Sequence, residues 1–385
     1  MTTVTAASRP DVGKALAGIL RRLLIPALSI VTSLVIGGVI IYLSGGNPLA
    51  GYEGLWQGAF GKPDSVVETL IKTTPYIFAG LAVAIGFRGG LFNIGVEGQL
   101  FVGSICAVSA GYAVSLPPVL HVAFALLAGA LGGALWAAIP GYLKARTGAH
   151  EVITTIMTNY IALRVINWTI SRDGPLRAPR NPLPETYRVH DSARLPMLIE
   201  DTRLHIGVVL AVIAAFFILW LLWRTPLGFE IRTVGLSNTA ARYAGIPVER
   251  TSVLTMCLSG ALAGLGGAVQ VLGLKGFFTT GFNVGLGFDS IAVAMLGGNH
   301  PFGVMLSALL FGTLDAGAAT MQLRTQVPRD IVVIIQGLIL MFVAAPALTR
   351  ALYRLRQPTA AGEVEDVAAT ITASWGGAAA SSEGD

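Results

Sequence analysis

The chain has 385 residues, of which 54% are hydrophobic and only 12% charged, and its mean hydropathy is +0.69. These values exclude a soluble globular domain and predict an integral membrane protein. The net charge of +5 could favour nucleic acid, but Lys and Arg stand mainly in loops beside apolar segments, so we interpret them as topology signals and expect no nucleic-acid partner.

Windows of roughly 20 apolar residues predict ten transmembrane helices, which makes the predicted fold all-α and polytopic. A basic segment precedes the first window without a clear cleavage site, so residues 1–23 are expected to be a cytoplasmic N-terminus before an uncleaved helix. Residues 24–350 form the predicted transmembrane domain and 351–385 a cytoplasmic tail, of which 358–385 is expected to be disordered. The predicted spans are 24–43, 69–87, 97–115, 119–140, 151–170, 205–223, 251–272, 278–299, 302–322 and 330–349.

Basic residues set the predicted orientation, in which both termini are cytoplasmic. Arg88, residues 144–146 and the loop 224–250 then lie inside, and the inner segments hold more Lys and Arg than the outer ones once the loop 171–204 is set aside. That loop is rich in proline and carries charges of both signs. We therefore interpret it as an ordered external cap or docking surface.

A Phe-Asn-Ile-Gly sequence at 92–95 returns 190 residues later as Phe-Asn-Val-Gly at 282–285, both in Gly-rich apolar surroundings. A helix broken by Gly and Asn frees backbone groups, which a bilayer tolerates only where protein or a water-filled cavity satisfies them. Ten spans divide into two sets of five, and an odd number in each set inserts the second set upside down. The sequence thus predicts an inverted five-plus-five repeat with broken helices, an arrangement typical of a transport path.

One face of the fifth predicted span is polar. Glu151, Thr154, Thr155, Thr158 and Asn159 recur at helical spacing, and Asn159 lies near the middle of the bilayer if Glu151 lies at its edge. This face suits a hydrophilic solute. It equally suits close packing against a neighbouring helix, because threonine often bonds its own helix backbone.

Charged and amide side chains inside predicted spans are costly to expose to lipid, so Glu97, Gln99, Asp289, Asp315 and Arg164 are functional candidates. Glu97 and Asp289 could instead cap the helix N-termini that the Gly-rich breaks create. Asp315 and Arg164 are more typical of structural pairing.

Phenylalanines beside the breaks could stack on a planar ring, although each could also serve packing alone. The predicted substrate pathway comprises Phe92, Asn93, Glu97, Gln99, Glu151, Thr155, Thr158, Asn159, Phe282, Asn283, Phe288 and Asp289.

The loop 224–250 is long and polar. Ser237 or Asn238 can begin a short helix that ends at Gly245, with Pro247 preventing its continuation. Such a helix could dock a soluble partner, and a plain surface loop is the alternative.

No nucleotide-binding P-loop, zinc-protease His pair or Gly-x-Ser-x-Gly elbow occurs, so we expect no enzymatic activity and no cofactor in this chain. Cys106 and Cys257 lie in apolar stretches, which predicts neither a disulfide framework nor a metal site.

Four segments together resemble permease subunits of ATP-binding cassette importers for nucleosides and simple sugars, within the ribose and branched-chain amino acid permease superfamily. They are Gly90-Leu-Phe-Asn-Ile-Gly-Val-Glu-Gly-Gln99, His150-Glu-Val-Ile-Thr-Thr-Ile-Met-Thr-Asn-Tyr-Ile-Ala162, Gly235-Leu-Ser-Asn-Thr-Ala-Ala-Arg-Tyr-Ala-Gly-Ile246 and Gly287-Phe-Asp-Ser-Ile-Ala-Val-Ala-Met-Leu-Gly-Gly298. The first two look most like the nucleoside branch.

The resemblance implies a permease in a bacterial cytoplasmic (inner) membrane, a separate ATPase subunit that uses ATP and Mg, a second permease subunit and an extracytoplasmic solute-binding lipoprotein. It also implies that 235–246 is the coupling helix received by the ATPase. By the same resemblance, the residues expected to carry the coupling role are Asn238, Ala240, Ala241, Arg242, Tyr243, Ala244 and Gly245.

Nucleosides are the favoured solute, and ribose-like sugars stay open because the same polar groups could hold hydroxyls. Two other classes of protein remain as alternatives: an ion-coupled secondary transporter using Glu97 or Asp289, and a membrane scaffold.

Overall fold

The structure, a computed structural model, describes residues 12–178, 183–279, 281 and 285–354. In these residues the chain forms fourteen α-helices and no β-strand beyond isolated bridges, which confirms the all-α prediction. The helices are α1 Val12–Leu43, α2 Pro48–Phe60, α3 Pro63–Arg88, α4 Val96–Ala113, α5 Pro118–Thr147, α6 Glu151–Thr169, α7 Gly207–Arg224, α8 Pro226–Leu236, α9 Asn238–Tyr243, α10 Val248–Gln270, α11 Leu286–Leu296, α12 Pro301–Thr325, α13 Asp330–Ala344 and α14 Pro346–Leu352, with a 3-10 turn η1 Asp191–Ala193 and a π turn η2 Val271–Lys275.

The chain divides into two compact units, Ile30–Ala344 and the terminal segments Met1–Ser29 with Ala345–Asp385. In the terminal unit, the buried hydroxyls of Ser29 and Thr349 lie 3.2 Å apart. The described candidate residues all lie in the larger unit.

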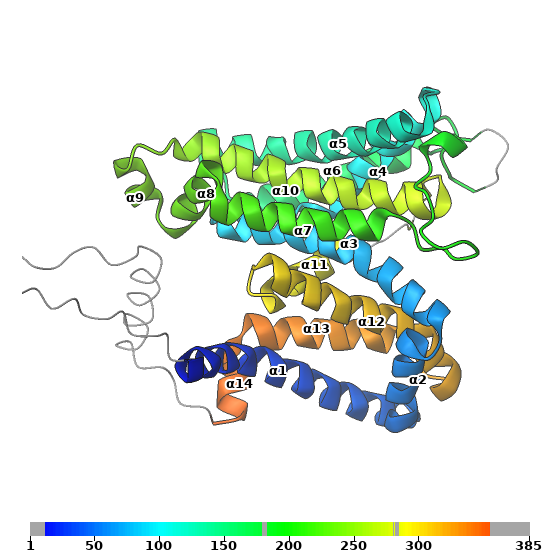
Figure 1. Cartoon of the computed structure of the whole chain (residues 1–385), viewed down its shortest axis with the longest axis vertical. Helices are drawn as coiled ribbons and strands as arrows, with labels where there is room; N and C mark the ends of the chain where they lie inside the picture. The colour runs from blue at the N-terminus through cyan, green and yellow to red at the C-terminus, as the bar shows by residue number, and fades with distance from the viewer. Residues whose placement is uncertain (1–11, 179–182, 280, 282–284, 355–385) are drawn as a thin grey trace, which may run out of the picture. The chain divides into compact units, whose positions relative to one another are not determined.

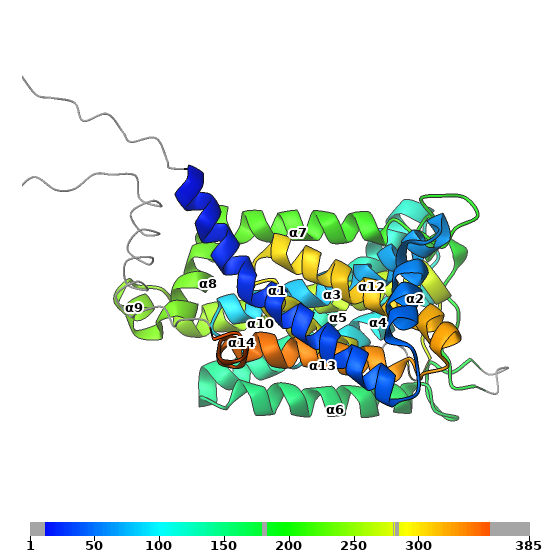
Figure 2. The same ribbon diagram turned by 90° about the horizontal axis from the view of Figure 1, so that it is seen from below.

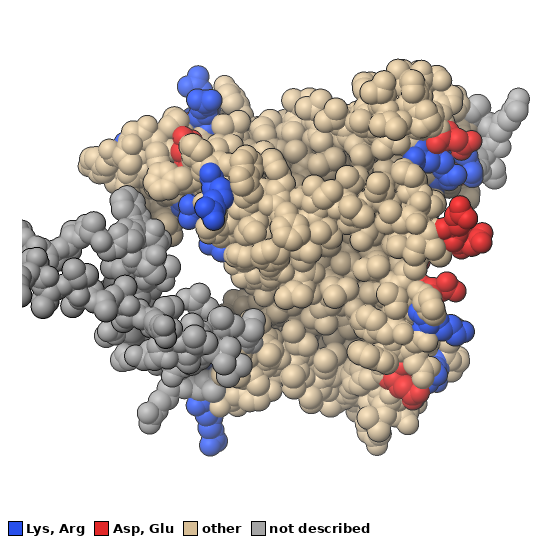
Figure 3. Space-filling model, in the orientation of Figure 1, with Lys and Arg blue, Asp and Glu red and all other residues tan. Residues whose placement is uncertain are grey.

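Six helices in the described chain are long and apolar enough to cross a membrane, or seven if α13 and α14 count as one span. Each of the ten predicted windows contains a helix, and a polytopic membrane protein is confirmed. The window 278–299 has the shortest helical part, because α11 has only 11 residues. On the visible face of the larger unit, charged side chains lie toward the ends of the helices and an uncharged band separates them (Figure 3), as a bilayer core requires.

Helix α2 lies outside the predicted spans because its 13 residues are too few to cross a bilayer. The side-chain oxygen of Asn47 accepts the N–H of Leu49 at 3.0 Å, and Pro48 occupies the first helical position, so the local sequence itself starts the helix. A Cβ atom on Gly54 would lie 2.9 Å from the Cα of Met321, so this glycine lets α2 pack directly on α12.

Helix α3 is the most enclosed element, and every residue from Thr73 to Gly86 is buried. It runs between α10 on one side and α11 and α12 on the other (Figures 1 and 2). Glycines bring α4, α5 and α10 to backbone contact, since a Cβ atom on Gly103, Gly133 or Gly264 would collide with the facing helix. These close crossings fix the start of α4, where the first Phe-Asn-Ile-Gly sequence lies.

The described part of the loop 171–204 is tied to the ends of neighbouring helices. The N–H of Leu195 donates to the carbonyl of Leu272 at 3.2 Å, and the ring of Tyr187 stacks on Tyr112 with 4.6 Å between centroids. The loop is thus a folded cover over this end of the larger unit.

His205 closes the loop region and is buried beside Gly273. Its Nδ1 accepts the N–H of Gly207 at 3.2 Å, which requires the neutral ring with the proton on Nε2. Burial, helped by the charge of Arg203, lowers the pKa of His205 to about 4. The imidazole is therefore neutral at physiological pH.

Candidate functional site

The first break, between α3 and α4, is closed by a pair of buried amides. Asn93 accepts the N–H of Gly95 at 2.9 Å, donates to the side chain of Gln99 at 3.0 Å, and receives a bond from the Gln99 amide at 3.1 Å. Asn93 also donates to the hydroxyl of Ser259 on α10 at 2.8 Å, and that hydroxyl donates to the carbonyl of Ala82. The amides thereby satisfy backbone and side-chain groups that the break would leave open.

The polar face of α6 meets this break. The side chain of Asn159 accepts the N–H of Gly98 and donates to the carbonyl of Ile94, both at 2.8 Å. Thr155 and Thr158 are buried, and their hydroxyls donate to carbonyls of their own helix at 2.7 and 2.8 Å. The shared face that the sequence predicted is real, and it packs α6 against the start of α4.

Glu151 lies apart from these buried groups at the start of α6. Its carboxylate pairs with the ammonium of Lys144, near the end of α5, at 2.9 Å. Arg164, exposed on the same helix, forms no ion pair within the residues that the structure describes.

Glu97 joins the two breaks. Its two carboxylate oxygens accept the N–H of Gly285 at 2.7 Å and of Gly287 at 2.6 Å, at the N-terminus of α11. Glu97 is only 5% exposed, and the N–H groups it binds are among the four that a helix start leaves without partners. Glu97 is therefore a helix cap, but for the helix of the second break rather than for α4, on which it stands.

Within the residues that the structure describes, the carboxylate of Asp289, on the first turn of α11, contacts Tyr76 and accepts no N–H of that helix. The hydroxyl of Tyr76 lies 3.4 Å from a carboxylate oxygen of Asp289 and 3.4 Å from one of Asp315. Tyr76 is buried on α3, so it links α11 and α12 across the middle helix. Asp315 thus has a structural partner, as its pairing interpretation expects.

The phenylalanines at the breaks are more open than the amides. Phe92 is 36% exposed and its ring lies 4.9 Å from that of Phe87, while Phe288 on α11 is 45% exposed. Phe282 and Asn283 lie outside the described residues. Among the described candidates, these two rings are the exposed side chains, Glu151 and Asp289 are half-buried, and the others are buried.

Residues 226–245 contain α8 and α9, and we call them the α8–α9 segment. The Ser237 hydroxyl begins α9 by accepting the N–H of Ala240 at 3.2 Å, and Gly245 ends it with a φ of +77°. Helix α9 stands out beyond the other helices of the larger unit in both views (Figures 1 and 2).

The residues of α9 have two different faces. Ala241 is fully buried against Val234 and Val248, whereas Tyr243 is 90% exposed, as is Leu236 at the end of α8, at 88%. Asn238, Thr239, Arg242 and Tyr243 line a shallow hollow, with Arg242 paired to Glu249 at 2.7 Å. Ala241 therefore seats the helix, and the exposed side chains form the surface available to a partner.

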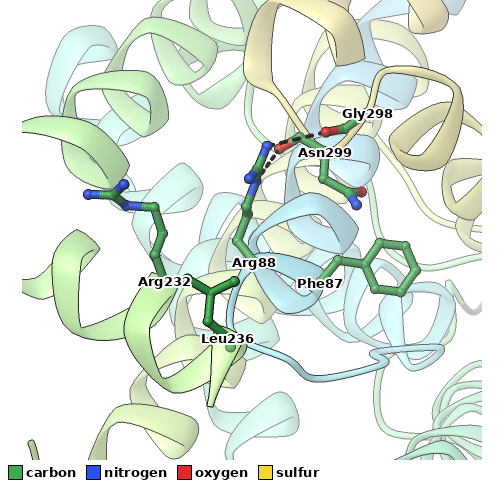
Figure 4. A pocket seen from close by; sticks show the side chains of 7 residues that line it. Phe87, Arg88, Arg232, Leu236, Gly298 and Asn299 are labelled. Atoms are coloured by element: carbon green, nitrogen blue, oxygen red, sulfur yellow. Dashed lines mark hydrogen bonds between the residues drawn. The ribbon is translucent and has the colours of Figure 1, made fainter. Parts of the chain in front are cut away.

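A second hollow of about 290 Å³ lies between the ends of α3, α8 and α11 (Figure 4). The Arg88 guanidinium reaches from α3 to the carbonyls of Asn299 at 3.0 Å and Gly298 at 3.3 Å, while Arg232 turns away from it. The sequence marked Arg88 only as a topology signal, because nothing near it in the chain indicates carbonyl partners some 210 residues away.

Residues 65–344 match the family described as branched-chain amino acid transport system / permease component. The guanosine ABC transporter permease protein NupP of Bacillus subtilis is 44% identical over 85% of this chain and 94% of its own length. The nucleoside ABC transporter permease protein NupB of Lactococcus lactis is 37% identical over 84% of this chain and 91% of its own length. The glucose ABC transporter permease protein TsgB13 of Haloferax volcanii is 33% identical over 82% of this chain and 86% of its own length. No solved structure matches the chain.

Proposed function

This chain belongs to the family of branched-chain amino acid transport system permease components, and on that premise we propose that it is the membrane-spanning subunit of an ATP-driven nucleoside importer. One observation carries the choice of solute: a guanosine permease shares 44% identity over nearly the whole length of both chains. A nucleoside permease at 37% identity over a similar length points the same way.

The division of labour follows from the family. A separate ATPase binds ATP and Mg and receives α9, a second permease subunit completes the pathway, and an extracytoplasmic lipoprotein delivers solute. In this arrangement the exposed Leu236 and Tyr243 are the contacts with the ATPase, and buried Ala241 holds α9 in place for them. The α8–α9 segment and both termini face the cytoplasm.

Within the proposed pathway the candidate residues have two roles. The amides form the wall of the pathway, because their hydrogen bonds go to groups of the first break; they are Asn93, Gln99 and Asn159. Phe92 and Phe288 offer partly open rings on which a nucleobase can stack, and stacking of a base on an aromatic ring is worth about 1–3 kcal/mol.

A sugar importer is the second candidate, because a glucose permease is 33% identical over 82% of the chain. Uptake of labelled guanosine, measured in a strain lacking this gene and complemented with it, separates the two when uridine, guanosine and ribose compete. We expect both nucleosides to compete and ribose not to. Competition by ribose alone would establish the sugar importer, and uptake by the purified chain without an ATPase would establish a secondary transporter.

Stacking is tested by Phe288→Ala, for which we expect the half-saturating guanosine concentration of uptake to rise on the order of tenfold. Phe124→Ala is the matched control, since Phe124 on α5 is 43% exposed and distant in sequence from both breaks. Equal effects of the two changes would remove Phe288 from the pathway.

A further inference from the structure

Arg88 binds the end of α11. Helix α11 stops at Leu296, and the carbonyls of Gly298 and Asn299 in the following turn accept the two bonds from the Arg88 guanidinium. These two carbonyls lie two and three residues beyond the end of α11, in the turn that leads to α12, and a cation is favoured near them because a helix C-terminus carries partial negative charge. The Arg88 guanidinium presents a planar fork of donors, which lets one side chain hold two carbonyls at once.

The same residue contacts the α8–α9 segment through its backbone. A Cβ atom on Gly235 would collide with the carbonyl oxygen of Arg88, so the last turn of α8 rests directly on the last residue of α3. Gly90, with a φ of +70°, makes the close approach possible on the α3 side, because a Cβ atom there would lie 3.0 Å from the Cα of Gly235.

Trp223 completes this junction from the end of α7. The guanidinium carbons of Arg88 and Arg232 lie 5.5 and 5.9 Å from the centroid of its ring. One aromatic side chain thus contacts both the arginine that holds α11 and an arginine of α8. Arg88 thus contacts both α8 and the turn after α11, at the edge of the hollow between them.

Helix α11 is therefore held at both ends by side chains from the first half of the chain, Glu97 at its start and Arg88 beyond its end. At 11 residues it is about 16 Å long. It carries Phe288 and Asp289, two residues of the proposed pathway.

We propose that Arg88 is a positioning residue that converts movement of the α8–α9 segment into movement of α11. The inference rests on the proposed function, because it takes α9 as the site where the ATPase acts. Arg88 touches no solute. Because α8 and the turn after α11 both contact Arg88, an ATP-driven displacement of α8 also displaces α11 and its Phe288.

The test uses the complete transporter, with its ATPase, partner permease and binding protein, reconstituted in vesicles. Arg88→Gln and Arg88→Lys change the fork, and Gly235→Ala displaces α8 without altering the Arg88 side chain. Arg146→Gln, an exposed arginine at the end of α5, is the matched control. Assembly, ATP hydrolysis and guanosine uptake are measured for each.

We expect the Arg88→Gln and Gly235→Ala transporters to assemble and to hydrolyse ATP within about twofold of the parent, whereas guanosine uptake falls on the order of tenfold. Arg88→Gln loses one to two charge-assisted hydrogen bonds, and Gly235→Ala loses the contact between α8 and the backbone of Arg88. Arg88→Lys should regain part of the uptake. The double variant should be no worse than the worse single one, since the two changes interrupt one path.

Normal uptake in Arg88→Gln, or parallel loss of hydrolysis and uptake in all three variants, would overturn the positioning role. Additive losses in the double variant would also overturn it, because they place the two residues on separate paths. Failure of the proposed function looks different: the parent transporter itself would then carry no nucleoside, whatever the state of Arg88.

Discussion

Removing the carboxylate of Glu97 should free the start of α11. In Glu97→Gln the amide keeps one oxygen for one of the two glycine N–H groups, but its NH2 turns a donor toward the other. One charge-assisted bond is lost and the charge that favours a helix N-terminus disappears, which together costs about 1.5–3 kcal/mol. Since 1.4 kcal/mol is a factor of ten, local opening at residues 285–289 becomes roughly 10- to 100-fold more frequent.

Amide hydrogen exchange of the purified protein in lipid nanodiscs measures this opening on the peptide that covers 285–289. Glu53→Gln is the control, because Glu53 is an acid in an exposed pair with Arg324 at 3.0 Å, and its loss should change stability by less than about 1 kcal/mol. Exchange at 285–289 that is no faster in Glu97→Gln than in Glu53→Gln would refute the cap. Faster exchange everywhere would show general unfolding rather than release of α11.

Three further predictions follow from single residues. Folding lowers the pKa of His205 below its ordinary 6.5. The contribution of His205 to the free energy of unfolding is therefore complete above pH 6.5 and falls by up to about 3 kcal/mol as the pH drops to about 4. The thermal midpoint should fall over that pH range, and His205→Gln should make the fall smaller. Asn159→Ala leaves the N–H of Gly98 and the carbonyl of Ile94 without this partner and should lower the free energy of unfolding, measured by thermal unfolding, by about 2 kcal/mol. Asn167→Ala, at a half-exposed position of the same helix, should lower it little. Equal losses would contradict the packing role of Asn159. Tyr243→Ala should weaken co-purification of the ATPase at least tenfold with unchanged thermal stability of the permease, and full retention of the ATPase would remove this face of α9 from the interface.

Local sequence was enough to locate the long helices. Apolar length decides where a chain can span a bilayer, and that property needs no knowledge of distant residues, so all ten windows contain a helix. The caps at Asn47 and Thr225 are equally local, but each begins a helix of 13 residues or fewer, below the length on which the predicted spans were chosen. Helices α2 and α8 were missed for that reason.

The candidate site was predictable as a set of residues and less so as a set of contacts. The spacing of Thr155, Thr158 and Asn159 indicated one face, and the structure places that face against Gly98 and Ile94. Which groups the face meets depends on how α4 and α6 pack. A helical period does not contain that information.

In the α8–α9 segment, too, the sequence predicted the residues but not their contacts. The resemblance assigned every residue of 238–245 except Thr239 to coupling, whereas the folded segment buries Ala241 and exposes Tyr243. A six-residue helix is too short for a hydrophobic period to separate its inner and outer faces in sequence.

The repeat that divides the chain explains why its two copies differ. Glu97 and Gly287 are equivalent positions, 190 residues apart, and they are bonded to each other. In a pair of halves related by a two-fold axis, equivalent residues meet only at the axis, so an axis of that kind would pass between the breaks; the inverted five-plus-five arrangement stays a prediction. A Cβ atom at Gly287 would collide with the backbone of Glu97, and two facing carboxylates would repel. Only one copy of the motif can keep the carboxylate, and the other must supply bare backbone for it to bind.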